Sequence, residues 1–318
     1  RNALSTLFLV DCAPLKMDSR FRRTMTLKCD LQYGKGDASY KLTRVGVRNV
    51  RKPVLVKREG LGRTLNNTLS CSMDIFVDLP ADQKGSHMSR NVEVINEVVE
   101  ESMRNPVTAI EDMAADICRK LLEHHEYAQN AEVHITAEYY KPNKTPQGRD
   151  TFEIYTLLAG GTIVRGGPVT KMVGARVVGM TACPCAQQTV TEMLGYSGEM
   201  PVMSHNQRNV CTLQVTMPEN VCIEAEDLID LVEDSFSSPT FELLKRPDEG
   251  QVVINAHRNT KFVEDVVRGV LQRFVTKFAD LPDDVAVDVQ SDSEESIHKH
   301  DAYAQRVATL GELRLENN

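Results

Sequence analysis

Five short polar segments in the second half of the chain contain the residue types that carry out metal and acid–base chemistry. They are TACPCAQ (181–187), SHNQRN (204–209), KRPDE (245–249), AHRN (256–259) and SEESIHKH (293–300). Cysteine, histidine and carboxylate side chains bind transition metals, and histidine and glutamate also transfer protons near neutral pH. The composition of these segments points to a metal-binding or hydrolytic site.

Two pairs within these segments have a spacing that favours the metal interpretation. Cys183 and Cys185 are two residues apart, as are His298 and His300, so on an extended backbone each pair projects from one face. A cysteine, a histidine and a carboxylate can close around a divalent metal and leave a position for water. A structural role stays open, because C-x-C lacks the C-x-x-C repeat of structural zinc sites and lone cysteines are commonly buried.

Other residues of these segments also have two readings. His205 and His257 fit hydrogen-bonded loop positions as well as ligand positions, and Glu294 and Glu295 fit a solvated acidic turn. The sequence has neither a G-x-x-x-x-G-K-S/T nor a G-x-G-x-x-G motif, so a bound nucleotide would not be held by a P-loop or Rossmann turn.

The elements that must position these segments follow a repeated order. In the first half, odd-numbered apolar residues from Leu69 to Leu79 predict a half-buried strand, and Thr108 and Glu111 have the spacing of a helix capping box. The pattern predicts strands at 41–57 and 68–79, helices at 89–103 and 108–122, and strands at 131–140 and 151–159.

The second half predicts the same order with one insertion. Strands are expected at 170–180 and 209–217, helices at 224–236 and 259–279, and a strand at 284–290; the segment 302–315 fits a strand or a helix. An extra helix at 187–194 should stop at Gly195. We therefore expect an α+β protein of two tandem β-β-α-α-β-β units, at 25–160 and 161–318, with antiparallel sheets and helices on one face. Residues 1–24 are expected to be an extension.

Composition excludes several classes of protein. The chain has 318 residues, of which 41% are hydrophobic and 26% charged, as expected for a soluble globular protein. The net charge of −8 (37 − 45) argues against a nucleic-acid partner, and no apolar run approaches the length that crosses a bilayer. Eight cysteines are too sparse for a disulfide scaffold, so we expect a reducing, cytoplasmic setting.

Taken together, the polar segments resemble a known family. TACPCAQ, SHNQRN, LLKRPDEG (243–250) and ESIHKHDAYA (295–304), with the earlier VDLPADQKGSHMSR (77–90), are similar to the type IB GTP cyclohydrolases, most closely the archaeal branch that opens the methanopterin pathway. The resemblance runs from about Leu42 to the C-terminus. It implies the tunnelling fold (T-fold), in which subunits join their sheets into a barrel, and a homo-oligomer, commonly a tetramer, with sites at subunit interfaces.

The resemblance also implies a metal centre. The cysteine of the family's C-P-C motif falls on Cys183, the histidine of H-N-Q-R on His205, and the glutamate of K-R-x-D-E on Glu249. Iron(II) is the metal expected for the archaeal branch, and the same ligands would accept zinc or manganese. A metal of this kind lowers the pKa of a water molecule, which gives a nucleophile at neutral pH for C8 of guanine.

Further residues correspond to catalytic positions of the family. Glu295, His298 and His300 fall on its acid–base and substrate-contacting positions, although His298 could instead approach the metal. Glu264 lies where T-fold enzymes place a carboxylate that binds the pyrimidine edge of a purine; a solvated helix position is its alternative. Cys185 is expected to be a thiol next to the ligands or a redox-sensitive neighbour of the site.

Three arginines inside the motifs, Arg208, Arg246 and Arg258, are candidate triphosphate contacts, with surface ion pairs as the alternative. The archaeal branch releases pyrophosphate and forms 7,8-dihydroneopterin 2′,3′-cyclic phosphate, whereas bacterial members retain the triphosphate. Two other hypotheses stay open: a relative that uses Cys183 or Cys185 as a covalent nucleophile, and a non-catalytic pterin- or purine-binding protein with a structural metal.

Overall fold

The computed structural model describes residues 31–36, 38–60 and 63–316, with only the backbone described at 58–60 and 63–66. The strands are β1 (Leu42–Gly60), β2 (Arg63–Leu79), β3 (Asn130–Lys144), β4 (Asp150–Val164), β5 (Val169–Ala182), β6 (Asn206–Pro218), β7 (Ser238–Pro239), β8 (Ala286–Glu294) and β9 (Ala302–Thr309). The helices are α1 (Met88–Arg104), α2 (Ile110–His124), α3 (Pro184–Leu194), α4 (Ala225–Glu233), α5 (Arg246–Arg258), α6 (Val263–Lys277) and α7 (Leu310–Glu316), preceded by the 3-10 turn η2 (Leu31–Tyr33). The expected extension at 1–24 lies outside the described residues.

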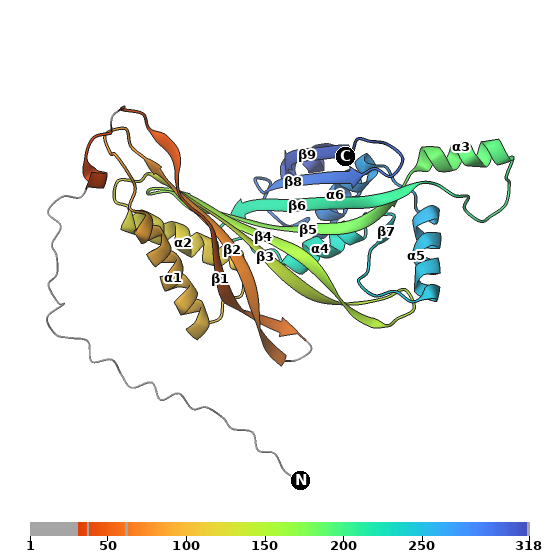
Figure 1. Ribbon diagram of the computed structural model, residues 1–318, viewed down its shortest axis with the longest axis horizontal. Helices are drawn as coiled ribbons and strands as arrows, with labels where there is room; N and C mark the ends of the chain where they lie inside the picture. The colour runs from red at the N-terminus through yellow and green to blue at the C-terminus, as the bar shows by residue number, and fades with distance from the viewer. Residues whose placement is uncertain (1–30, 37, 61–62, 317–318) are drawn as a thin grey trace, which may run out of the picture.

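Within the described part of the chain, the strands form one continuous antiparallel sheet of nine strands (Figure 1). Its order is β1-β2-β3-β4-β5-β6-β8-β9, and the short β7 pairs with β5. The strands β4 and β5 pair across the turn at 165–168, so both halves of the chain contribute to the same sheet. The expected division between residues 160 and 161 falls inside β4. The α+β class and the antiparallel sheet are confirmed.

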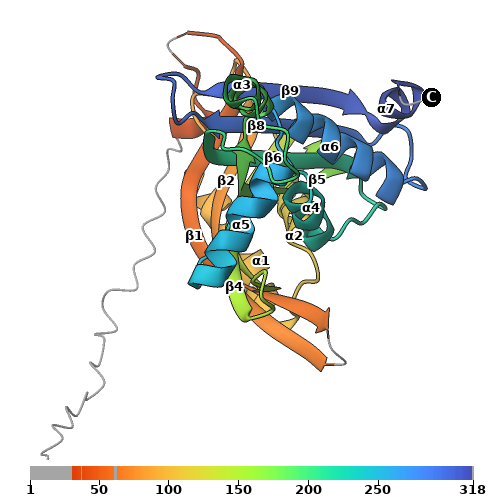
Figure 2. The same ribbon diagram turned by 90° about the vertical axis from the view of Figure 1, so that its right-hand side faces the viewer.

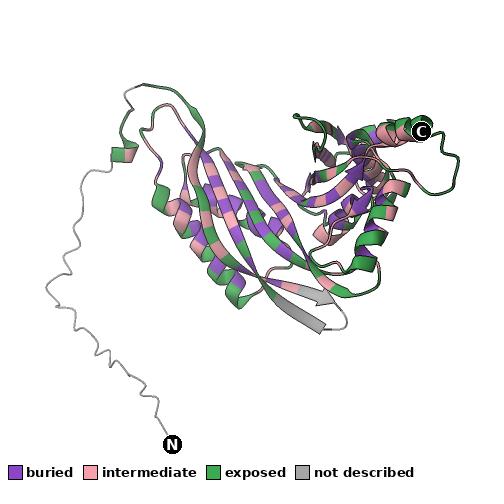
Figure 3. Cartoon of the chain, turned by 45° about the vertical axis from the view of Figure 1, so that its right-hand side comes forward, coloured by how far each residue is buried: buried purple, intermediate pink, exposed green. Residues whose placement is uncertain are grey.

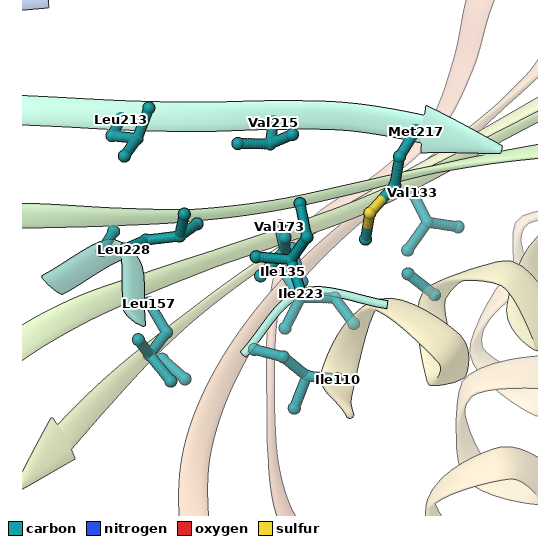
Figure 4. Packing of buried hydrophobic residues seen from close by; sticks show 14 of the residues in the cluster. Ile110, Val133, Ile135, Leu157, Val173, Leu213, Val215, Met217, Ile223 and Leu228 are labelled. Atoms are coloured by element: carbon teal, nitrogen blue, oxygen red, sulfur yellow. The ribbon is translucent and has the colours of Figure 1, made fainter. Parts of the chain in front are cut away.

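One face of the sheet is apolar across almost its whole width. Directly opposed residues of antiparallel strands point to the same side, so the register links side chains from strand to strand. One such row is Met73, Ile135, Ala159, Val173, Val215 and Val287, all nearly inaccessible to solvent. Buried side chains of α1, α2, α4 and α6 belong to the same core cluster, and Figure 4 shows part of this packing.

The opposite face of the sheet is polar. Ser72, Thr136, Thr156 and Arg176 alternate with the buried residues of their strands and are half-buried or exposed. Figure 3 shows the resulting alternation of buried and exposed positions along the strands. The helices that enter the core therefore cover one face and leave the other open, because only one face carries the apolar row.

Two helix starts differ from the sequence prediction. Thr108 does not cap α2, which begins at Ile110 after Ala109. The reason is that Val107 forms a parallel bridge with β1: its N–H donates to the Leu55 carbonyl, and its carbonyl accepts from Lys57. Likewise, α6 begins only at Val263, later than expected from the apolar pattern.

Other details of the second half are resolved by the structure. The segment 302–315 is a strand followed by a helix, β9 and α7. The expected helix at 187–194 begins earlier, at Pro184, and ends at Gly195 with the predicted left-handed φ of 57°. Helix α5 was not anticipated. Figure 1 shows α3 and α5 at the same end of the molecule, and Figure 2 is the view from that end. No helix among the described residues is long and apolar enough to span a membrane.

Candidate active site

The structure brings Cys183 and His205 together where β5 ends and β6 begins. Residues 182 and 206 are directly opposed in the sheet, so the α3 excursion leaves from and returns to the same point. The Cys183 N–H donates to the His205 carbonyl at 3.1 Å, and the Ser204 hydroxyl donates to the Cys183 carbonyl at 2.6 Å. Two residues that are distant in sequence are thus fixed as neighbours by the strand register.

The imidazole of His205 is oriented by a side-chain network. Its Nδ1 lies 3.0 Å from Oε1 of Gln207, and the Gln207 amide nitrogen donates to Oε1 of Glu295 at 3.3 Å. Because an amide oxygen only accepts, Nδ1 of a neutral His205 carries the proton and Nε2 keeps its lone pair. Within the described residues, no hydrogen bond to Nε2 is found. The ring is thus prepared to bind a metal through Nε2.

Glu295 holds a buried oxygen without a partner. Its Oε2 is inaccessible and makes no hydrogen bond within the described part of the chain. The Nδ1 atom of His205 lies 3.7 Å from this oxygen, which is too far for a hydrogen bond. Buried carboxylate oxygens are normally satisfied. We infer that a ligand, metal or water completes this position.

A cavity of about 210 Å³ joins several of the sequence-predicted residues. It lies between the ends of β5, β6 and β8, the start of β9 and the first turn of α6. Its lining consists of Cys183, Gln207, Lys261, Phe262, Val263, Glu264, Ser293, Glu295 and Ala302. A thiol, two carboxylates and an amine from three separate segments therefore face one space.

The loop before α6 is attached to the end of β5. The Lys261 N–H donates to the Ala182 carbonyl at 3.0 Å, and the Asn259 side chain donates to the Phe236 carbonyl at 2.9 Å. At the helix start, the Phe262 N–H donates to the Asp265 carboxylate. These contacts place Lys261 and Glu264 beside Cys183. Burial, and secondarily the nearby Arg273, lower the pKa of the Lys261 ammonium.

The two histidines of the β8–β9 loop lie at the edge of this site. His298 and His300 are stacked, with ring centroids 5.1 Å apart, and the His298 ring is 6.4 Å from that of His205 in an edge-to-face arrangement. Both are exposed, as is Cys185 in the first turn of α3. None of the three lines the cavity.

Glu249 is not brought to the Cys183–His205 pair. It is exposed near the start of α5, whereas the end of α5 approaches the pair, through a contact between His257 Nε2 and the Ser204 carbonyl at 3.2 Å. The eight residues between 249 and 257 correspond to about 12 Å along the helix axis. Within the described residues, no group of three His, Cys, Asp or Glu side chains is placed to hold a metal ion.

The fit to a metal is therefore partial. A thiol and an imidazole with a free Nε2 are suitable donors for a divalent transition metal, and the unpartnered Glu295 oxygen shows that the site is polar and incomplete. The third expected ligand does not reach them in the single chain.

The three arginines are dispersed. Arg208 alternates with Gln207 along β6, so its side chain projects to the sheet face opposite the cavity. Arg246 and Arg258 stand at the two ends of α5, and the Arg258 guanidinium lies 3.8 Å from the Met200 sulfur. The structure does not gather these cations into one phosphate site.

Among the cavity residues that the sequence did not single out are Lys261 and Gln207. Gln207 lies inside SHNQRN, in which only His205 and Arg208 were predicted to be site residues. Lys261 follows AHRN by two residues and had no motif of its own. A lysine is ordinarily a surface residue, so only the cavity distinguishes this one.

Comparison with known families assigns the chain to a class of enzymes. Residues 29–304 match the family described as type I GTP cyclohydrolase folE2, and the chain belongs to this family.

Its similarity is to archaeal relatives in particular. The chain is 43% identical to GTP cyclohydrolase MptA 1 of Methanocella arvoryzae over 303 residues, covering 90% of this chain and 95% of the relative. It is also 43% identical to GTP cyclohydrolase MptA of Methanothermobacter thermautotrophicus, covering 86% and 91%. Among solved structures, a uricase from Bacillus fastidious aligns over 87% of this chain and 96% of its own with a TM-score of 0.49 and 9% identity. The family assignment does not depend on that alignment.

Proposed function

We propose that the protein is a metal-dependent GTP cyclohydrolase. It would hydrolyse the imidazole ring of GTP, release formate and form 7,8-dihydroneopterin 2′,3′-cyclic phosphate with loss of pyrophosphate, the first step of a methanopterin-type pterin pathway. The observation that carries the proposal is the cavity where Cys183, Glu264 and Glu295 meet from three separated motifs. Membership of the type I GTP cyclohydrolase family and the names of the relatives support it.

Each residue in or beside the cavity would have a separate role in the reaction. Glu264, at the start of α6, would accept hydrogen bonds from the N1–H and 2-amino groups of guanine and so hold the base. Glu295, kept in place by Gln207, would hold and move a proton at N7 while C8 is hydrolysed. His298 and His300, at the rim, would exchange protons with solvent as formate leaves.

Cys183 and His205 would hold the metal, with Glu249 as the proposed third ligand and iron(II) as the preferred ion over manganese or zinc. When bound, such an ion supplies a water of lowered pKa at neutral pH. Cys185 is proposed as a neighbouring thiol whose oxidation would inactivate the site.

The assembled protein is proposed to be a homo-oligomer of tandem T-fold units, of which a tetramer is the expected size. The open polar face and the exposed Glu249 support this proposal, because assembly of several sheets into a barrel would cover the face and bring further groups to each site. We propose that Arg208, Arg246 and Arg258 meet the triphosphate only in that assembly.

After formate leaves, the ribose carbons would rearrange and the ring would reclose to the dihydroneopterin, and the archaeal-type product then requires one further step. In the cyclic-phosphate route, the 2′-hydroxyl of the dihydroneopterin side chain attacks the α-phosphorus, and pyrophosphate leaves with the bond to the β-phosphate. Without this step, the product is the bacterial-type 7,8-dihydroneopterin triphosphate.

The test is GTP turnover by full-length protein that has been stripped of metal and reconstituted anaerobically with iron(II), manganese or zinc. Mass spectrometry would identify formate and the phosphate products. We expect formate and the cyclic phosphate, with activity abolished in Cys183→Ala and kept in Cys222→Ala, a control at another free, exposed cysteine. Retained triphosphate would establish the bacterial-type product. Metal-loaded protein that releases no formate would refute the enzyme proposal.

A further inference from the structure

Lys261 is the one residue with a cationic side chain in the lining of the cavity. It is half-buried, and its backbone is fixed by the hydrogen bond to Ala182. Across the described residues, its ammonium group has no hydrogen bond and no ion pair. The ammonium is therefore available to donate to an acceptor that enters the cavity.

The charges around the cavity leave room for such an acceptor. Glu264 and Glu295 line the same space but are not paired with Lys261. Asp265, a nearby carboxylate outside the cavity, accepts from the Phe262 N–H and lies 3.6 Å from Arg268. Its charge also attracts the Lys261 ammonium and by itself raises the pKa of that group. Burial and, secondarily, the like charge of Arg273 outweigh the attraction of Asp265 and lower the pKa of the ammonium. The cavity thus combines one unused donor group with carboxylate acceptors.

This combination matches the edge of guanine. Guanine presents O6 as an acceptor next to the N1–H and 2-amino donors, whereas adenine has an amino donor in place of O6. We propose that Lys261 is a specificity-determining residue that donates to O6 of the guanine base while Glu264 accepts from N1–H and the 2-amino group. This inference rests on the proposed function, since it takes GTP as the ligand.

The triphosphate is the less suitable partner for Lys261. Its several negative charges would face Glu264 and Glu295 inside a cavity of about 210 Å³, and like charges at short range disfavour binding. A neutral base makes no such conflict.

The experiment measures equilibrium binding of ligands whose ring cannot be opened. In 7-deazaguanosine triphosphate a carbon replaces N7, so no hydrolysis competes with binding. Its counterpart without O6 is 7-deaza-6-thioguanosine triphosphate, which keeps the N1–H and 2-amino donors for Glu264 and carries the weak acceptor sulfur in place of O6. Dissociation constants would be measured by calorimetry on the full-length, metal-loaded protein. The variants are Lys261→Met and Lys261→Arg, and Lys120→Met, on α2, is the matched control.

Loss of a hydrogen bond from a charged donor should weaken binding of the O6-containing ligand in Lys261→Met by about 10- to 100-fold. Binding of the ligand without O6 should change by less than about threefold. Lys261→Arg keeps a donor and should retain more affinity than Lys261→Met, which preserves the test if Lys261→Met does not fold. Equal losses for both ligands, or none for either, would overturn the role of Lys261 alone. Wild-type protein that binds neither ligand would overturn the proposed function.

Discussion

Replacing Gly179 with alanine tests how tightly β5 packs against Phe236, the residue whose carbonyl fixes the loop before α6. A Cβ added at Gly179 would lie 2.1 Å from Cδ2 and 2.3 Å from Cγ of Phe236, whereas carbon atoms pack best at about 3.5–4.0 Å. The ring would have to move by more than about 1 Å. Phe236 is only 2% exposed, and Gly179 is paired with Pro239 of β7, so neither side moves easily.

We expect Gly179→Ala to lower the free energy of unfolding by about 2–3 kcal/mol, the upper part of the range for overpacked cores. Urea denaturation followed by circular dichroism gives this value, provided that the slope with denaturant is unchanged. Gly250→Ala is the matched control. No atom lies within 4 Å of its Cβ and it sits in helix α5, so it should be neutral or stabilising by up to about 1 kcal/mol.

A second substitution identifies the clash. Phe236→Leu frees space beside Gly179, so the double variant should lose less stability than the two single variants added together, by at least about 1 kcal/mol. Because the Phe236 carbonyl holds Asn259, Gly179→Ala should also raise the KM for GTP, and Phe236→Leu should partly restore it. Unchanged stability in Gly179→Ala, or strictly additive losses, would refute the packing argument.

Three further perturbations test other parts of the structure. Burial raises the pKa of Glu111 to about 7 from 4.5, so the free energy of unfolding of the wild type should fall as the pH rises between these values. In urea unfolding the decrease from about pH 5 to about pH 8 should reach up to about 3 kcal/mol, and it should be absent in Glu111→Gln. Burial lowers the pKa of His125 to about 4 from 6.5, so stability should fall as the pH drops through this window, and titration of unfolding in His125→Gln should show a flatter profile. Asp248 accepts a hydrogen bond from the Gln147 N–H in the β3–β4 hairpin and so anchors α5. Asp248→Ala should free α5 with Glu249 and reduce the iron bound per chain, measured by plasma mass spectrometry. Full iron occupancy, or an equal reduction in the exposed control Asp280→Ala, would contradict this anchoring role.

The local periodicities of the sequence determined most of the secondary structure. Alternation in β2 and the apolar stripe of α2 were sufficient, because strands and helices that bury one face repeat every 2 and 3.6 residues. The C-cap at Gly195 followed from the conformational freedom of glycine. Helix α5 was not predicted because it has no apolar stripe. Few of its residues are buried, Val252 and Ala256 among them.

The motifs in the sequence identified the family and supplied candidate site residues, but not which of these residues meet. That Cys183 adjoins His205 depends on the register of β5 and β6, and that Glu264 and Glu295 share a cavity depends on how α6 rests on the sheet. Arg208 and Gln207 are adjacent in sequence, yet alternation places them on opposite faces. Lys261 became a candidate only through its place in the cavity lining and because, in the described chain, its ammonium forms no hydrogen bond or ion pair. Residue types and spacing are local properties that a sequence states directly, whereas charge pairing and proximity arise from long-range contacts that exist only once the sheet has formed.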